Sequence, residues 1–173
     1  MNKTWFIADL HFGHKNIINL ENRPFENVGE MDNILIFKWN SAVKKDDKVF
    51  ILGDYSFYDK NKTSEITNKL NGNKTLIKGN HDNHSEKWYL DCGFKSVYSY
   101  PIIYKDWFVL SHEPPTYFNN NMPYAFFYGH THSCNLYPTF TKNTCCVCSE
   151  RHNYAPILFE NIVEIMKNMN ESG

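Results

Sequence analysis

Side chains that commonly bind metal ions stand directly after five apolar runs of this chain. The polar clusters are Asp9-Leu10-His11, Gly53-Asp54, Gly79-Asn80-His81-Asp82, Ser111-His112 and Gly129-His130-Thr131-His132. They offer carboxylate oxygens, imidazole nitrogens and an amide oxygen. All-oxygen sets favour Ca²⁺ or Mg²⁺ and thiolate sets favour structural zinc, whereas mixed sets suit Mn²⁺, Fe²⁺, Co²⁺, Ni²⁺ or Zn²⁺. The clusters therefore predict a transition-metal site.

The number of these side chains predicts two ions rather than one. The candidate ligands are Asp9, His11, Asp54, Asn80, His112, His130 and His132. This set is too large for a single ion that must keep a position open for substrate. Two ions about 3.5–4 Å apart form a clamp for in-line displacement at phosphorus. One shared carboxylate and water would complete the two coordination shells.

The apolar runs that precede the clusters predict the elements that position them. Runs of this length, rich in β-branched and aromatic residues, indicate buried strands. In an open α/β sheet, ligands bind at the carboxyl ends of the strands. We therefore expect five strand ends to meet at one place, after residues 5–8, 49–52, 75–78, 108–110 and 125–128.

The order of the clusters resembles the calcineurin-like metallophosphoesterase family. The family pattern D-x-H, G-D, G-N-H-[DE], a single H and G-H-x-H is present in full between Asp9 and His132. The stretch from Trp5 to Ile18, followed by Asn22-Arg23-Pro24-Phe25, looks more narrowly like the small phosphoesterases of bacteria and their phages. The resemblance implies an α/β fold with two packed mixed β-sheets flanked by helices, a four-layer αββα sandwich.

The resemblance also implies a role for each residue of the pattern. The two divalent ions, with manganese favoured over Fe, Ni, Co or Zn, would share Asp54. The first would be held by Asp9, His11 and His132, and the second by Asn80, His112 and His130. His81 would act as general acid at the leaving group, with Asp82 orienting it and keeping it protonated. The nucleophile would be a metal-bound hydroxide.

Other elements follow from local patterns. Apolar residues at three- and four-residue spacing predict a helix from residue 28 to 41, and we expect shorter helices at 64–70 and 85–90. Alternation predicts strands at 97–104 and 107–111, turning at Lys105-Asp106. A further strand is expected at 144–149 and a helix at 159–169.

Composition limits the remaining possibilities. A chain of 173 residues with 42% hydrophobic content predicts one globular domain over residues 1–173. The net charge of −1 gives no bulk basic field that would attract nucleic acid. No signal-peptide pattern and no apolar stretch approaching the ~18 residues of a membrane span are visible. We therefore expect a cytoplasmic protein with reduced thiols and no membrane contact.

The cysteines leave one alternative open. Cys145-Cys146-Val147-Cys148 could form a thiolate metal site, but alternation on a buried strand, with cysteine as a small hydrophobe, is favoured.

Several residues outside the ligand set are candidates for substrate contact. Arg23 could clamp a phosphate with its guanidinium fork, with His14 and Asn16 upstream on the same segment. His84 could touch substrate or cap the helix that follows. Residues 113–123 form the best candidate lid. Aromatic residues that could stack on a base are Phe12, Tyr55 and the pair Tyr117-Phe118.

These observations predict a dinuclear metal-dependent phosphoesterase. A phosphodiesterase acting on a small or nucleotide-like substrate is favoured, since the chain leaves little room for a capping domain. One alternative is a nuclease on single-stranded nucleic acid, which would be a substrate only. Its groove could use Lys44, Lys45 and Lys48, although Asp46 and Asp47 interrupt that row. A different class is a non-catalytic metal-stabilised scaffold, against which the intact His81-Asp82 pair argues.

Overall fold

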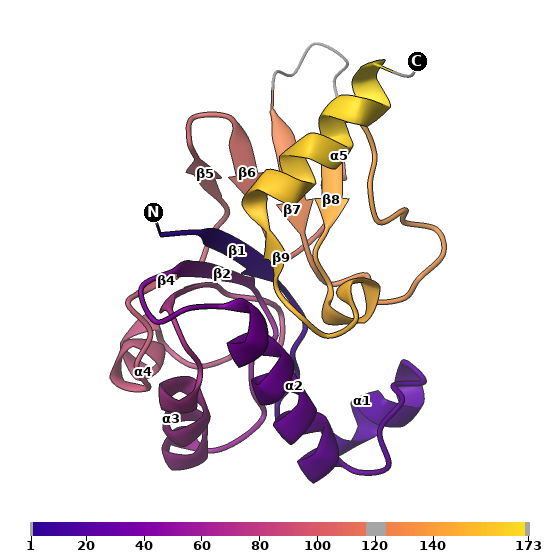
Figure 1. Ribbon diagram of the computed structural model, residues 1–173. Coiled ribbons are helices and arrows are strands. Elements are labelled where there is room, and N and C mark those ends of the chain that lie inside the picture. The colour runs from indigo at the N-terminus through magenta and orange to yellow at the C-terminus, as the bar shows by residue number, and fades with distance from the viewer. Residues whose placement is uncertain (1, 117–123, 172–173) are drawn as a thin grey trace.

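The computed structural model describes residues 2–116 and 124–171 (Figure 1). Its strands are β1 (Thr4–Ile7), β2 (Lys48–Leu52), β3 (Asn73–Ile77), β4 (Ser96–Tyr98), β5 (Ile102–Tyr104), β6 (Phe108–Leu110), β7 (Ala125–Tyr128), β8 (Thr144–Cys146) and β9 (Ile157–Leu158). Its helices are α1 (Lys15–Leu20), α2 (Val28–Ala42), α3 (Lys60–Lys69), α4 (Glu86–Asp91) and α5 (Phe159–Glu171), with a 3₁₀ turn at Ser149–His152.

The strands form two mixed sheets. The first has the order β4-β3-β2-β1-β9, in which β1 to β4 are parallel and β9 is antiparallel to β1. The second has the order β5-β6-β7-β8, in which β6, β7 and β8 are parallel and β5 is antiparallel. Because β1, β2 and β3 are parallel, and β6 and β7 are parallel, the polar clusters behind them lie at the carboxyl ends of their sheets.

The two faces of the five-stranded sheet bury different sets of side chains. On one face, Val49 and Ile51 of β2 pack with Leu35 and Trp39 of α2 and with Ile66 of α3. The opposite face carries Phe6, whose ring meets Phe127 of the second sheet edge to face at 5.0 Å. Residues of β2 alternate between the two faces because successive side chains of a strand point to opposite sides. The helices on one face and the second sheet on the other thus fix the strand register.

The fold prediction of two packed mixed sheets with flanking helices is confirmed. Helices α1 to α4 cover the first sheet, and α5 lies beside the second (Figure 1). The buried residues of α5, Phe159, Ile162 and Met166, join the core that also contains Phe6 and Phe127. Among the described residues, α5 is therefore the helix that accompanies the second sheet, and its buried side chains reach the core between the two sheets. None of the helices within residues 2–116 and 124–171 is long and apolar enough to cross a membrane.

Most predicted elements are confirmed with small shifts, and one is wrong. The five strands before the polar clusters are present, as are the helices near 28–41, 85–90 and 159–169. The helix expected at 64–70 begins earlier, at Lys60, because Asp59 caps it by accepting from the Lys62 amide at 2.9 Å. The strand expected at 97–104 is two strands: β4 pairs with β3 in the first sheet and β5 with β6 in the second.

Candidate metal centre

The ligand residues follow the strand ends in a strained backbone conformation. Asp9, His11, Asp54, His130 and His132 all have positive φ, between 43° and 67°. This left-handed region is uncommon for residues with a side chain and costs of order 1–3 kcal/mol each. The chain thus turns sharply as each strand ends. Such strain persists only where surrounding contacts over-determine the backbone, and it is concentrated here at the candidate site.

A first group of side chains gathers around Asp9. Its Oδ1 atom lies 3.9 Å from His11 Nε2 and 3.6 Å from His132 Nε2. The other oxygen, Oδ2, accepts a hydrogen bond from the His130 amide at 2.9 Å. Ligand atoms of Asp9, His11 and His132 are close enough together to hold one metal ion.

A second group gathers around His112. Its Nε2 atom lies 2.9 Å from Asn80 Oδ1, and His130 Nδ1 lies 3.1 Å from the same oxygen. His112 Nδ1 is 2.8 Å from the carbonyl oxygen of Leu52. If Nδ1 donates to the Leu52 carbonyl, Nε2 and Asn80 Oδ1 both direct lone pairs at the same place, as two ligands of one ion would.

Asp54 joins the two groups. Its Oδ2 atom lies 3.6 Å from His11 Nε2 in the first group and 3.5 Å from His112 Nε2 in the second. Its Oδ1 atom accepts from the His81 amide at 2.9 Å, which holds the carboxylate in this orientation. The structure therefore brings all the predicted ligands together, with Asp54 between the two groups.

The unpaired polar atoms at this place fit a cation. Within the described residues, the buried side-chain atoms without a hydrogen-bond partner are Asp9 Oδ1, both ring nitrogens of His11, and His14 Nδ1. A buried polar atom left unpaired costs about 1–3 kcal/mol, and a metal ion would satisfy Asp9 Oδ1 and His11 Nε2. Two glycines let the ligand side chains come this close together. A Cβ atom at Gly53 would overlap the His112 ring, and a Cβ atom at Gly79 would overlap the Asp54 carboxylate.

Arg23 lies beneath this site and not on its surface, so the prediction that it clamps substrate is wrong. Its side chain is fully buried, and Nη1 and Nη2 donate to the carbonyl oxygens of Leu10 at 3.0 Å and Asp9 at 2.7 Å. Nε and Nη2 donate to Glu150 Oε1 at 2.9 and 2.6 Å. With its donors turned inward, the guanidinium supports the Asp9 loop.

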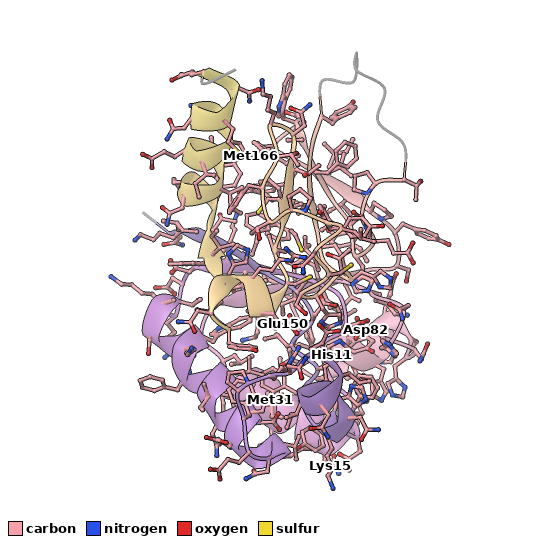
Figure 2. The ribbon with its side chains drawn as sticks, turned by 90° about the vertical axis from the view of Figure 1, so that its right-hand side faces the viewer. His11, Lys15, Met31, Asp82, Glu150 and Met166 are labelled. Carbon is pink, nitrogen blue, oxygen red and sulfur yellow. The ribbon has the colours of Figure 1, made fainter. Side chains whose placement is uncertain are left out.

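Glu150 is a residue that the sequence patterns missed. Besides Arg23, its Oε1 receives a hydrogen bond from His132 Nδ1 at 2.9 Å, which leaves Nε2 of that ring directed at Asp9. Figure 2 shows Glu150 and His11 in the same central region of the molecule. Glu21, His132 and Glu150 also lie close enough to hold an ion, but Glu21 accepts from Ser133 Oγ at 2.6 Å. No spacing signal marked Glu150, because it follows β8 and matches none of the polar clusters.

Burial and charge shift the pKa values around Asp9. Burial raises the pKa of Asp9 to about 6 against the lowering effect of His132. Burial also raises the pKa of Glu150, but the hydrogen bond from His132 and the charge of Arg23 outweigh it and lower the pKa to about 2. Burial likewise lowers the pKa of His11 far below its ordinary value. A carboxylate at Glu150 and a neutral His11 are the forms suited to metal binding.

The residues predicted to be catalytic occupy different environments. The His81 ring is exposed and lies 5.6 Å from the His11 ring and 5.2 Å from that of Phe57. Asp82 is buried and does not hold His81. Its carboxylate accepts from the amides of Gly79, Asp54 and Tyr55 at 2.9, 2.7 and 3.1 Å, and from the Tyr89 hydroxyl at 3.3 Å. The prediction that Asp82 orients His81 is therefore wrong, because its acceptor sites serve two ligand-bearing loops.

The predicted substrate contacts are only partly at the surface. His14 is half-buried and stacks on Phe57 at 4.1 Å, and Asn16 is exposed on α1. Phe57 itself is 43% exposed and was not predicted. His84 stacks on Trp88 at 4.0 Å, and the cap of α4 is Ser85, which accepts from the Trp88 amide.

Phe12 and Tyr55 are fully buried, so the prediction that they stack on a base is wrong. Tyr117, Phe118 and most of the expected lid lie outside the described residues. Cys145, Cys146 and Cys148 are fully buried, as small hydrophobic residues would be, but the strand expected at 144–149 ends at Cys146, so Cys148 lies beyond it.

Comparison with known proteins identifies the family. The family model for calcineurin-like phosphoesterases matches residues 3–134, which contain every candidate metal ligand. The chain belongs to the calcineurin-like phosphoesterase family. This calcineurin-like phosphoesterase domain model covers β1 to β7, the elements whose ends carry the ligands.

Two proteins resemble this calcineurin-like phosphoesterase over nearly all of its length, and a phage protein resembles about half of it. It is 35% identical to the uncharacterized protein MJ1445 of Methanocaldococcus jannaschii, over 96% of this chain and 93% of that protein. It is 41% identical to the gene 66 protein of Mycobacterium phage L5 over 47% of this chain and 41% of the phage protein. The crystal structure of the protein of unknown function AQ665 from Aquifex aeolicus matches with a TM-score of 0.70 and 26% identity, over 95% of this chain and all of that one.

Proposed function

We propose that this protein is a dinuclear metal-dependent phosphodiesterase that hydrolyses a small or nucleotide-like phosphoester. The observation that carries the proposal is the position of Asp54 Oδ2, 3.6 Å from His11 Nε2 and 3.5 Å from His112 Nε2. A carboxylate oxygen about equally distant from two imidazole groups suits a bridge between two ions. The mixed nitrogen and oxygen ligands suit Mn²⁺, Fe²⁺, Co²⁺, Ni²⁺ or Zn²⁺, and the resemblance to the family favours manganese among these.

The residues of the site would have three roles: binding the ions, donating a proton, and holding the ligands in position. Asp9, His11 and His132 would hold one ion and Asn80, His112 and His130 the other, with Asp54 shared. Bound ions would supply charge for the phosphoryl oxygens and lower the pKa of water. His81 is exposed beside the site and would donate a proton to the leaving oxygen. Arg23 and Glu150 would keep the His132 ring and the Asp9 loop in place.

The positions of the lysines and of His81 argue against the two alternatives, a nuclease and a metal-stabilised scaffold. A nuclease would act through the same centre and would need a basic groove. Lys44, Lys45 and Lys48 precede or begin β2, whereas the ligands follow the carboxyl ends of the strands, so these lysines are poorly placed to line it. A metal-stabilised scaffold would not require an exposed imidazole beside the ligands. We therefore favour a diesterase with a compact substrate.

Metal content and two model substrates test the proposal. The protein is stripped with chelator and reloaded with Mn²⁺, and metal is measured per chain. Turnover of bis-p-nitrophenyl phosphate is then compared with that of p-nitrophenyl phosphate. Two ions per chain and faster cleavage of the diester are expected. Single occupancy would contradict the dinuclear site, faster monoester cleavage would indicate a phosphatase, and two ions without turnover would favour the scaffold.

A further inference from the structure

A cavity of about 510 Å³ opens beside the candidate metal centre. Two of the residues that line it, Asn80 and His112, belong to the ligand set. Its volume falls in the range of about 300–1,000 Å³ that is typical of small-molecule sites. The cavity lies where the two sheets meet, because Ile77 comes from β3 and Phe126 from β7.

The walls of this cavity suit a flat, largely apolar group. Ile77, Pro101, Val109 and Phe126 contribute apolar surface. Tyr100, which is 80% exposed, also lines it. An exposed aromatic ring over an apolar hollow is a platform on which a base can stack.

The charged groups of the cavity further restrict the chemical class of ligand that it can bind. Lys78 is half-buried immediately before Gly79-Asn80, and its ammonium has no carboxylate partner in the part of the chain that the structure describes. Such a donor suits the carbonyl oxygens and ring nitrogens of a base. The carboxylate of Glu113 also lines the cavity. It disfavours a second phosphate group there and can accept from a ribose hydroxyl.

His81 indicates which ester arm the cavity would take. Its ring lies beside His11 and Phe57, and it is absent from the cavity lining among the described residues. The leaving group therefore belongs beside His81, and the cavity remains for the arm that stays on phosphorus. We propose that this cavity binds the retained nucleoside arm of a phosphodiester substrate, an assignment that rests on the proposed function.

Substrates with one leaving group and different retained arms test the inference. These are the p-nitrophenyl esters of methyl phosphate, phenyl phosphate and thymidine 5′-phosphate. Base stacking predicts kcat/KM about 5–150-fold higher for the thymidine ester than for the methyl ester. Val109→Trp, which fills the cavity, and Lys78→Gln should both bring this ratio toward one. Ile165→Trp and Lys167→Gln, exposed positions on α5, are the matched controls and should preserve it.

A binding measurement makes the test independent of turnover. Thymidine 5′-monophosphate should bind more tightly than methyl phosphate in calorimetry, and Val109→Trp should remove the difference. If no ester is cleaved but the nucleotide binds in this way, the proposed function fails, and with it the role of the cavity in catalysis, while the cavity remains a nucleotide-binding site. If all esters are cleaved equally and both phosphates bind alike, the cavity assignment is overturned. Equal preference for phenyl and thymidine arms would overturn the nucleoside in favour of any apolar group.

Discussion

The guanidinium of Arg23 and the carboxylate of Glu150 form a buried ion pair, with Nη2 and Oε1 2.6 Å apart. The pair touches ligand-bearing loops from both sheets. Arg23 donates to the carbonyl oxygens of Asp9 and Leu10, which follow β1 in the sequence. Glu150 accepts from His132, which follows β7. Neither Arg23 nor Glu150 is one of the predicted metal ligands. The effects of substituting them on metal affinity and on the free energy of unfolding can therefore be measured separately.

Glu150→Gln should weaken metal binding, and it should destabilise the fold less than Arg23→Met does, because the glutamine oxygen can still accept from Arg23. A carboxylate that accepts from a metal-binding histidine fixes its ring and raises its basicity, and losing it typically costs 10–100-fold in affinity. The measurement is Mn²⁺ affinity by competition with a chelating dye. Glu164→Gln, an exposed position on α5, is the control. The glutamine oxygen can still accept from His132, so unchanged affinity in Glu150→Gln would show that the negative charge of Glu150 does not strengthen His132 as a ligand.

Arg23→Met should destabilise the fold strongly. It leaves Glu150 buried without its cation, and breaking a buried ion pair on one side costs about 3–5 kcal/mol. The double variant Arg23→Met/Glu150→Met should recover part of this loss, because it leaves no unpaired charge. Urea unfolding of both variants gives the comparison. A double variant less stable than the single one by the full cost of a second substitution would contradict the coupling.

His81→Ala should keep its metal and lose rate. A positioned general acid contributes about 10²–10⁴-fold, and the ring is exposed beside the ligands. The loss should be smaller for p-nitrophenyl esters than for alkyl esters, because a good leaving group needs little protonation. Metal content and kcat are measured on the same preparation. Metal lost in parallel with rate would make His81 a ligand and refute the assignment.

Asp82→Asn should behave differently from His81→Ala. Asp82 accepts from three backbone amides of the Asp54 and Gly79 loops through both of its carboxylate oxygens. An asparagine keeps only one acceptor oxygen, and its NH₂ group would face at least one of these amide donors. We expect a loss of about 1–3 kcal/mol in the free energy of unfolding together with weaker metal binding. Thermal unfolding with and without Mn²⁺ provides the test. A variant of normal stability that loses only rate would restore Asp82 as a direct partner in catalysis.

Asp47→Asn should reveal a pH-dependent contribution to stability far from the metal centre. Burial raises the pKa of Asp47, but hydrogen bonds from the Lys44 and Lys3 amides and the Trp5 indole outweigh it and lower the pKa below its ordinary value of 3.8. A carboxyl with a lowered pKa contributes its stability above the unfolded-state value and loses it as the pH falls through the folded-state value.

Wild type should therefore exceed Asp47→Asn by about 1–3 kcal/mol at pH 7, and the difference should shrink below pH ~4. Urea unfolding at pH 7 and pH 3 measures it. A difference that is equal at both pH values would show that the pKa of Asp47 is not lowered.

Local patterns predicted the parts of the fold that depend on local chemistry. The apolar runs predicted β1, β2, β3, β6 and β7 because buried strands need continuous apolar residues. Alternation, in contrast, misassigned residues 97–104 to one strand. The alternating pattern continues through Ser99-Tyr100-Pro101, while the chain passes there from one sheet to the other. Nothing in a local pattern distinguishes one long strand from two short ones in different sheets.

The sequence was enough to predict the metal-ligand residues of the candidate site, but not the residues that support those ligands. Motif spacing marks residues such as Asp9 and His132, because each directly follows a strand. The pairing of Arg23 with Glu150 spans 127 positions of the sequence, so only tertiary structure brings them together. Arg23 was assigned to substrate from the chemistry of its guanidinium, but its burial directs that chemistry to the protein's own carbonyl and carboxylate groups.

The ligands come from both sheets: Asp9, His11, Asp54 and Asn80 follow strands of the first, and His112, His130 and His132 follow strands of the second. Ions held between them would therefore cross-link the two layers, in addition to the apolar contacts of the core and the Arg23–Glu150 pair. An ion that binds the folded chain more tightly than the unfolded chain adds RT ln(1 + [L]/Kd) to the free energy of unfolding. Chelation would then loosen the junction of the sheets first, and amide hydrogen exchange would rise at the ends of β2 and β7 before it rose at the helices packed on the outer face.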